Sequence, residues 1–216
     1  MLFFFFGSFL KTGRYDMLDS KKISSDQSLR LKILFIAICF SVSASLQVFQ
    51  EWFIYWRLHF YSELWRAWTA HWVHVGWIHF ALNLFAFACL PFIFPNLKMR
   101  YLAILLLILP PCISLSFYYF YPHVEAYAGL SGVLHGLYVA VAIYHLKFPK
   151  ERKFATLVLA LTFSKIAWEH FFGSLDTADL IGSPVLVEAH WLGVVWASLI
   201  SLIYFAFQKH FFRADR

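Results

Sequence analysis

The sequence predicts an all-α integral membrane protein, a bundle of six transmembrane helices with both termini on the cytoplasmic side. Hydrophobic residues make up 61% of the 216 residues, charged residues only 14%, and the mean hydropathy is +0.65. Average globular domains contain about 45–50% apolar and about 25% charged residues. A soluble domain of this composition would expose apolar patches of a size that soluble monomers rarely show. The composition therefore excludes soluble, disordered and nucleic-acid-binding proteins.

Residues 1–30 are predicted to form a cytoplasmic N-terminal segment. The apolar start, Met1 to Leu10, is too short to span a membrane. It also lacks the preceding basic residues that open a signal peptide. Because Met17 begins a more ordinary cytoplasmic start, residues 1–16 are interpreted as a start-site artefact.

Six apolar runs follow, each long enough to cross about 30 Å of hydrocarbon as a helix. They lie near residues 31–50, 72–94, 101–121, 127–147, 153–172 and 185–207, inside a predicted six-helix domain of residues 31–208 with a cytoplasmic tail at 209–216. Lys and Arg concentrate in four stretches between or beyond these runs, at 11–32, 98–100, 147–153 and 209–216. Since cationic loops stay in the cytoplasm, the first, third and fifth helices are expected to run outward.

The exterior segment 51–70 is rich in Trp, Tyr and Phe but is interrupted by charged residues. Trp and Tyr favour the level of the lipid headgroups, so we expect interfacial structure that lies partly in the outer leaflet. Arg66 is expected to anchor this segment. The three cysteines, Cys39, Cys89 and Cys112, all lie in apolar runs, and an odd number there argues against a disulfide framework.

Polar side chains mark the outer ends of the three inward-running helices. They are His74, His79 and Asn83 on the second helix, Ser131 and His135 on the fourth, and His190 on the sixth. Polar groups at membrane depth are costly and usually face a cavity or a partner. Three helix N-termini at one depth also point their positive dipole ends at the space between them, which favours a developing oxyanion.

Two stripes of small residues predict how these groups meet. They are Gly132, Gly136 and Ala140 on the fourth helix, and Gly193, Ala197 and Ser201 on the sixth. Small residues allow close backbone approach, and packing stripe on stripe would bring the His190 imidazole beside the Ser131 hydroxyl. A nearby His can activate a Ser nucleophile. His79 and Asn83 share one helix face, and with the backbone N–H of Ser131 they could stabilise an oxyanion.

These residues carry a resemblance to a known family. The pattern Trp65-Arg66, then His74, His79 and Asn83, then Gly129-Leu130-Ser131-Gly132, then Ala189-His190 with Gly193, resembles rhomboid intramembrane serine proteases across all six core spans. The resemblance implies a six-helix rhomboid-like bundle with a catalytic dyad of Ser131 and His190. It implies that His79 and Asn83 donate to the oxyanion, and that His74, His135, Gly129 and Gly132 support the site. No cofactor and no metal ion are expected.

Further residues resemble the rhombosortase branch of that family. His135 stands where typical rhomboids have a Tyr that stacks on the catalytic His, and it could stack on His190 or hydrogen-bond to it. The segment 165–169 and the short loop 173–184 complete the resemblance. It implies membrane-anchored protein substrates whose C-terminal tails hold a Gly-Gly-type motif, a transmembrane helix and a basic cluster. The expected partners are these substrates and the lipid bilayer, with no nucleic acid, and the compact form suits a bacterial inner membrane.

Two other classes of function compete with a protease. A haem protein could use intramembrane histidines as ligands, but this leaves Ser131 among glycines and Asn83 beside His79 unexplained. An inactive rhomboid-like protein could bind membrane clients, although the presence of both Ser131 and His190 counts against it. A zinc protease is disfavoured because the sequence contains no His-Glu-x-x-His motif.

Three charged residues near the site receive structural interpretations. Lys165 and Glu169 are four residues apart near the outer end of the fifth helix, which predicts an ion pair that offsets the burial of both charges. Substrate docking is the alternative role for this pair. Glu188 lies two residues from His190 and would point elsewhere on a regular helix, so it is not assigned as a third catalytic residue.

Overall fold

The computed structural model describes residues 3–173, 178, 181–182 and 184–214, and the side chains from residue 26 to residue 206 within those ranges. The chain divides into two compact units, Met1–Cys39 and Phe40–Arg216. The first unit consists of the N-terminal part of helix α1 (Phe3–Val48). The second unit contains the remaining elements and all the candidate site residues.

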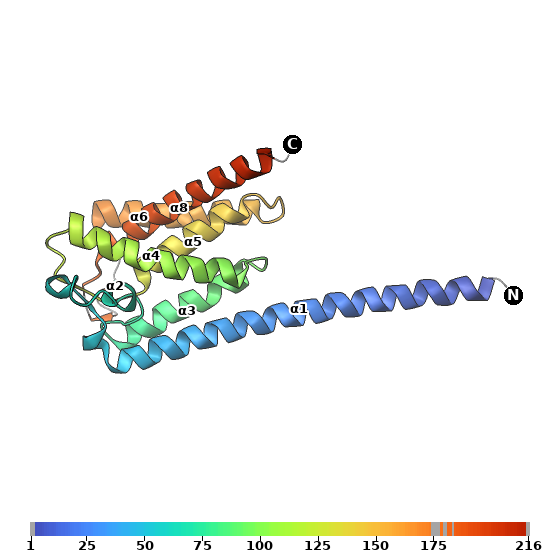
Figure 1. The fold of residues 1–216 in the computed structure, drawn as a ribbon, viewed down its shortest axis with the longest axis horizontal. Helices are drawn as coiled ribbons and strands as arrows, with labels where there is room; N and C mark the ends of the chain where they lie inside the picture. Colours follow the sequence, from blue (N-terminus) through green and yellow to red (C-terminus); the bar gives the residue numbers. More distant parts are fainter. Residues whose placement is uncertain (1–2, 174–177, 179–180, 183, 215–216) are drawn as a thin grey trace. The chain divides into compact units, whose positions relative to one another are not determined.

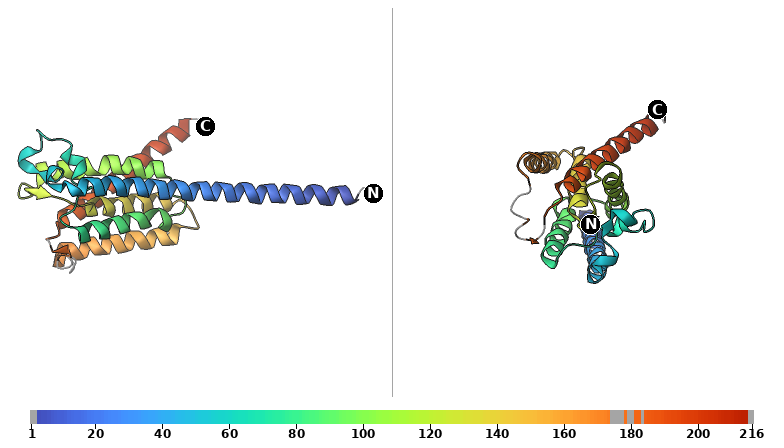
Figure 2. Two further views of the ribbon diagram at one scale, coloured as in Figure 1. Left: turned by 90° about the horizontal axis from the view of Figure 1, so that it is seen from below. Right: turned by 90° about the vertical axis from the view of Figure 1, so that its left-hand side faces the viewer.

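The second unit is a helical bundle (Figures 1 and 2). Its long helices after α1 are α3 (Trp77–Ile93), α4 (Met99–Phe120), α5 (Ser131–His145), α6 (Arg152–Phe172) and α8 (Val187–Ala214). Helix α5 is the central element, since it contacts α3, α4, α6 and α8. Most of its residues are buried, including Leu137, Val139 and Ala140. The polar groups at the start of α5 are therefore surrounded by other helices.

Short elements join the helices at the end of the bundle where α5 begins. They are η1 (Gln50–Trp52), β1 (Tyr55–Trp56), η2 (Arg57–His59), α2 (Arg66–Thr69) and β2 (Ala126–Tyr127). Strands β1 and β2 pair antiparallel, with Tyr55 opposite Tyr127 and Trp56 opposite Ala126. The segment after α1 is therefore tied by a two-stranded sheet to the segment that leads into α5.

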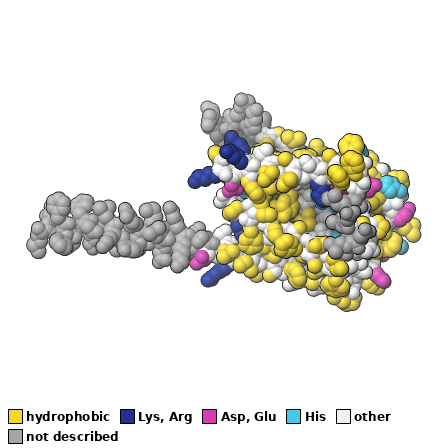
Figure 3. Space-filling view, turned by 180° about the vertical axis from the view of Figure 1, so that it is seen from behind, with side chains coloured by type: hydrophobic (Ala, Val, Ile, Leu, Met, Phe, Trp, Pro, Cys, Tyr) yellow, Lys and Arg dark blue, Asp and Glu magenta, His cyan; other side chains and the backbone are white. Residues whose placement is uncertain are grey.

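A helix covers most of each of the six predicted ranges, and α1 begins well before the first of them, at Phe3. Among the described residues, three helices are long and apolar enough to cross a membrane: Asp26–Val48, Met99–Phe120 and Val187–Ala206, with Trp77–Ile93 as a shorter apolar helix. Large apolar side chains also face outward, and Phe85, Leu107 and Leu161 are each more than 60% exposed. Figure 3 shows a face of the molecule that is largely covered by hydrophobic side chains. The chain is an integral membrane protein.

The sequence places His74 on the second helix, and this is wrong. Helix α3 begins at Trp77, and His74 lies in the loop before it. The Gln47 side chain accepts a hydrogen bond from the His74 N–H (2.7 Å) and donates one to the His74 carbonyl (2.8 Å). Gly76 is fully extended directly before the helix, with φ −165° and ψ 169°. Gln47 thus holds the loop against α1 outside the helical geometry.

The fourth predicted range also begins too early. Tyr127 belongs to β2, and Gly129 has φ +150°, a conformation that favours glycine. Helix α5 starts at Ser131. The correction matters for the site because it places Ser131 in the first helical turn, where backbone N–H groups have no acceptor within the helix.

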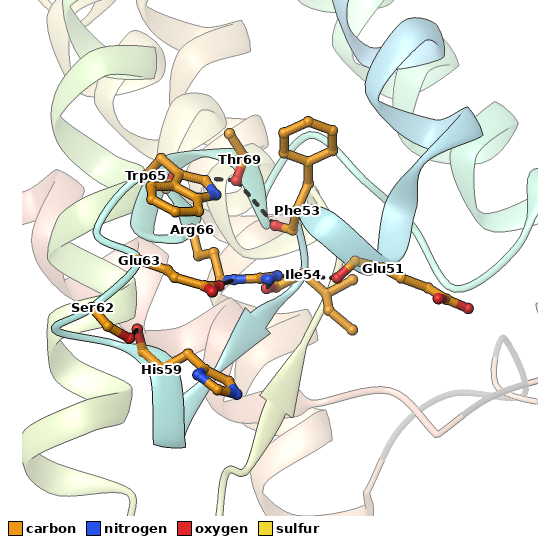
Figure 4. Close-up of polar contacts among 9 residues, drawn as sticks. All are labelled: Glu51, Phe53, Ile54, His59, Ser62, Glu63, Trp65, Arg66 and Thr69. Atoms are coloured by element: carbon orange, nitrogen blue, oxygen red, sulfur yellow. Dashed lines mark hydrogen bonds and ion pairs between the residues drawn. The ribbon is translucent and has the colours of Figure 1, made fainter.

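Arg66 organises the segment that the sequence predicts at the membrane interface (Figure 4). The Arg66 side chain is 8% exposed, pairs through Nε with the Glu63 carboxylate, and donates from Nη1 to the carbonyls of Glu51 (3.1 Å) and Ile54 (2.8 Å). The planar fork of guanidinium donors suits these simultaneous contacts. Around it, aromatic side chains such as Trp52 remain exposed. Arg66 is the structural anchor that the sequence predicts.

The predicted stripes of small residues pack against each other where α5 meets α8. A Cβ atom added to Gly193 would lie 1.9 Å from the Gly132 carbonyl oxygen, and one added to Gly132 would lie 2.6 Å from the Ala189 carbonyl oxygen. A Cβ on Gly136 would lie 2.7 Å from the Gly193 carbonyl oxygen. These helices can approach so closely only because the positions are glycines.

We expect the substitution Gly193→Ala to destabilise the bundle, because the new methyl group forces α5 and α8 apart. Overpacking typically costs about 1–3 kcal/mol, so the thermal unfolding temperature in detergent should fall clearly below that of the wild type. Gly76→Ala is the matched control, since open space surrounds a Cβ at that position. Equal unfolding temperatures for the two variants would contradict the packing described here.

Candidate active site

Ser131 and His190 meet at the N-terminal ends of α5 and α8. Ser131 is the first residue of α5, and His190 lies in the first turn of α8. The Ser131 Oγ and the His190 Nε2 are hydrogen-bonded at 3.0 Å. The close backbone approach at Gly132 and Ala189, the residues next to this pair, brings the two side chains within reach of each other. The packing of the two stripes of small residues thus brings the Ser131 hydroxyl beside the His190 imidazole, as the sequence predicts.

The second nitrogen of His190 contacts Glu169 in the last turn of α6. His190 Nδ1 lies 2.8 Å from Glu169 Oε2, while Glu169 Oε1 accepts from the Lys165 ammonium group at 2.5 Å. An ionised carboxylate only accepts hydrogen bonds, so Nδ1 carries the imidazole proton. In the neutral imidazole, Nε2 is then the nitrogen that can accept from the Ser131 hydroxyl.

The predicted ion pair between Lys165 and Glu169 is confirmed, but sequence reasoning missed the contact from Glu169 to His190. The signal in the sequence was an acidic residue within a predicted membrane span, which usually marks a partner or a functional site. Glu188, which is not assigned as a third catalytic residue from the sequence, pairs with His123, with 3.5 Å between Glu188 Oε1 and His123 Nε2.

His135 stacks on His190, which decides between the two contacts left open by the sequence. The ring centroids are 4.2 Å apart and the ring planes differ by 23°. The Nδ1 of His135 donates to the backbone carbonyl of Ser131 at 2.7 Å, which fixes the orientation of the ring. His135 thus covers one face of the His190 imidazole.

A cavity of about 480 Å³ opens in front of these residues, between α3 and α6 and over α5. Its polar wall is formed by His79, Asn83, Ser131, His135, Lys165 and His190. Leu82, Leu134 and Leu161 contribute to its apolar wall. The cavity is large enough for a few amino-acid residues, and the apolar lining suits an apolar segment of polypeptide.

Asn83 and His79 lie on the α3 side of the cavity. The Asn83 Nδ2 donates one hydrogen bond to the His79 carbonyl at 3.1 Å. Because an amide nitrogen carries two hydrogens, the second remains to donate into the cavity. Gly129 lets the His79 ring approach the loop closely, since a Cβ on Gly129 would lie 3.0 Å from His79 Cε1.

His74 and Tyr127 support the loop that leads into α5. His74 is fully buried, contacts the His79 ring with centroids 5.0 Å apart, and accepts from the Leu130 N–H at 3.4 Å. The Tyr127 hydroxyl donates to the Gly129 carbonyl at 2.6 Å. Burial raises the pKa of the Tyr127 phenol, so the phenol stays protonated and keeps this hydrogen bond.

Within the described residues, His135, Glu169 and His190 form a group whose potential metal-ligating atoms lie within 4.8 Å of one another. Zinc is bound at about 2.0–2.1 Å along the in-plane lone pair of an imidazole nitrogen. The His135 and His190 rings are stacked, so their lone pairs run side by side and do not converge on one point. The stacked arrangement suits neither a shared metal ion nor two imidazoles on opposite faces of a haem.

The bundle and its site define a membrane-embedded helical protein with a serine hydroxyl hydrogen-bonded to a buried imidazole. The family model of the rhomboid domain matches residues 61–207, which include all these site residues. The chain therefore belongs to the rhomboid family, whose members are generally intramembrane serine proteases. A search of curated proteins finds no significant match to the sequence.

We expect Tyr127→Phe to lower stability, because it leaves the buried Gly129 carbonyl without its donor. An unsatisfied buried group costs about 1–3 kcal/mol, which thermal unfolding in detergent will detect. Tyr119→Phe is the matched control, because the Tyr119 side chain is exposed and its hydroxyl contacts only the exposed hydroxyl of Tyr61 among the hydrogen bonds described here. If both variants unfold at the wild-type temperature, the loop does not depend on Tyr127.

Proposed function

We propose that this rhomboid-family protein is an intramembrane serine endopeptidase with Ser131 as the nucleophile and His190 as the general base. The observation that carries the proposal is the 3.0 Å hydrogen bond between Ser131 Oγ and His190 Nε2 at the wall of the cavity. A serine hydroxyl is a weak nucleophile until a neighbouring base takes its proton, and this arrangement provides that base.

In the proposed reaction, His190 Nε2 takes the hydroxyl proton as Ser131 Oγ attacks the scissile carbonyl carbon. The resulting oxyanion accepts hydrogen bonds from the Ser131 backbone N–H, Asn83 and His79. The protonated imidazole then donates its proton to the leaving amine as the C–N bond breaks. Water attacks the acyl-enzyme in the same way, and the released Ser131 hydroxyl recovers its proton.

The cavity supports a membrane-embedded polypeptide as the substrate. Apolar side chains of α3 and α6 flank it, so a transmembrane segment could enter from the lipid between these two helices. An intact helix shields its carbonyl groups, and glycine lowers the cost of leaving the helical conformation. This requirement and the resemblance to rhombosortases favour C-terminal tails with a Gly-Gly-type motif, a transmembrane helix and a basic cluster.

The distribution of charge supports an orientation in the membrane. Lys98 precedes α4 and Arg100 lies in its first turn, while Lys147 and Lys150 lie between α5 and α6 and Arg152 and Lys153 begin α6. All of them are at the end of the bundle opposite to Ser131. By the positive-inside rule, the site then lies near the outer face. We propose six spans with both termini in the cytoplasm of a bacterial cell, in its inner membrane. Cleavage would release the exterior part of the substrate.

We expect Ser131→Ala and His190→Ala to abolish cleavage of a reporter that ends in a Gly-Gly-type transmembrane tail. Both variants should remain folded, since the close backbone contacts of α5 and α8 at Gly132, Gly136 and Gly193 involve neither side chain. The measurement is the release of the reporter from proteoliposomes, together with labelling of the wild type at Ser131 by a fluorophosphonate probe. Full processing by either variant would defeat the assignment of the nucleophile and base.

The same experiment separates the competing functions. A non-catalytic binding protein would retain the reporter uncleaved and would not react with the probe. A haem protein would show stoichiometric haem in a reduced-minus-oxidised absorption spectrum. Labelling without cleavage of the Gly-Gly tail would support the protease and contradict the proposed substrate.

We expect Asn83→Ala to slow cleavage by roughly 10²–10³-fold, the usual effect of removing one oxyanion donor. Asn96→Ala is the matched control, because Asn96 lies at the opposite end of the bundle, where it donates to Glu151. The measurement is the initial rate of reporter release for both variants. A wild-type rate for Asn83→Ala would remove Asn83 from the oxyanion site.

A further inference from the structure

Glu169 is more deeply buried than a simple ion-pair partner of Lys165 needs to be. The Glu169 side chain is 4% exposed, while the Lys165 side chain is 35% exposed and lines the cavity. A pair at i and i+4 can form at a helix surface, where neither charge loses its contact with water. Burial of a carboxylate is costly unless its oxygens are hydrogen-bonded and its charge is compensated. The burial of Glu169 therefore calls for a second partner.

That second partner is His190, on a different helix and 21 residues away in the sequence. The two oxygens of Glu169 have separate tasks, since Oε1 accepts from Lys165 Nζ at 2.5 Å and Oε2 accepts from His190 Nδ1–H at 2.8 Å. Each contact restricts the carboxylate from a different side. A carboxylate held in this way can in turn hold the imidazole ring that it contacts.

We infer that Glu169 is a positioning residue for His190, so that the site is a Ser131–His190–Glu169 triad and not a dyad. This inference rests on the proposed function of Ser131 and His190. Glu169 keeps the imidazole proton on Nδ1, which leaves Nε2 free to accept the Ser131 proton, and its negative charge stabilises the imidazolium that then forms. Lys165 holds Glu169 in place and balances its charge.

The stacked ring of His135 complements this arrangement. His135 covers a face of the His190 ring, whereas Glu169 contacts its edge at Nδ1. Stacking alone is compatible with two ring orientations, which a half-turn about the Cβ–Cγ bond interconverts by exchanging Nδ1 with Cδ2. The hydrogen bond to Glu169 selects the orientation with Nδ1 toward the carboxylate. The two contacts together fix the direction in which Nε2 points.

The test measures how fast a fluorophosphonate probe labels Ser131 in the full-length protein, as a function of probe concentration. In this reaction the Ser131 Oγ–P bond forms, fluoride leaves, and His190 takes the hydroxyl proton. We expect Glu169→Gln to lower the rate constant at saturating probe by about 10²–10⁴-fold, the usual range for a general base and its orienting carboxylate. The half-saturating probe concentration should remain unchanged, because Glu169 does not bind the probe.

Glu188→Gln is the matched control. Glu188 lies two residues from His190 in sequence but pairs with His123, so the labelling rate constant of Glu188→Gln should equal that of the wild type.

A second variant controls for the charge of Lys165. Since Glu169→Gln leaves Lys165 without its carboxylate, the double variant Lys165→Met, Glu169→Gln removes the unpaired cation as well. It should fold with normal thermal stability and label as slowly as Glu169→Gln.

The outcomes separate this inference from the function on which it rests. A wild-type protein that is not labelled at Ser131 would overturn the proposed protease and the triad with it. Labelled wild type with an unchanged rate constant in Glu169→Gln would overturn the triad alone. Recovery of the rate in the double variant, or an equal loss in Glu188→Gln, would also overturn it, because the effect would then come from a stray charge or from general destabilisation.

Discussion

The contact between the backbones of α5 and α8 is the constraint on which the site depends. Gly132, Gly136 and Gly193 carry no side chain where the two helices meet, so carbonyl groups of one helix closely approach the other helix. A larger residue at these positions would force the two helices apart. The 3.0 Å contact between Ser131 and His190 is a consequence of this packing, because both residues lie next to it.

A second constraint comes from placing polar groups among apolar helices. The side chains from Lys165 to Ser131 form a series of hydrogen bonds: Lys165 with Glu169 within α6, Glu169 with His190 of α8, and His190 with Ser131 of α5. This series of hydrogen bonds joins α6, α8 and α5, so the charged groups of the site also link the helices that surround it. The half-exposed Lys165 is at the cavity, where water can reach the charge that balances Glu169.

The sequence predicted the parts of the site that depend on local periodicity. The small residues of 132–140 and 193–201 recur every four positions, so they had to share a helix face, and their packing followed from size alone. The loop conformations could not be read in this way. His74 leaves the helix because of a distant side chain, Gln47, and Gly129 breaks the fourth apolar run through its positive φ. The contact of Glu169 with His190 was missed because it depends on how α6 is rotated about its axis against α8, which the sequence of α6 alone does not specify.

The segment between α1 and α3 acts on the site through the backbone and not through a side chain in the cavity. Arg66 ties together the carbonyls of Glu51 and Ile54, next to strand β1. Strand β1 pairs with β2, and two residues later the Gly129 N–H donates to the carbonyl of Ala70, directly after α2. The segment that Arg66 organises therefore holds the loop before α5 at two places: through strand β1 at its start and through the Ala70 carbonyl at its end. Because Ser131 is the first residue of that helix, the position of the serine depends on a buried arginine in a separate part of the fold, and this explains physically why the Trp65-Arg66 pair belongs to the same sequence pattern as the serine and histidine.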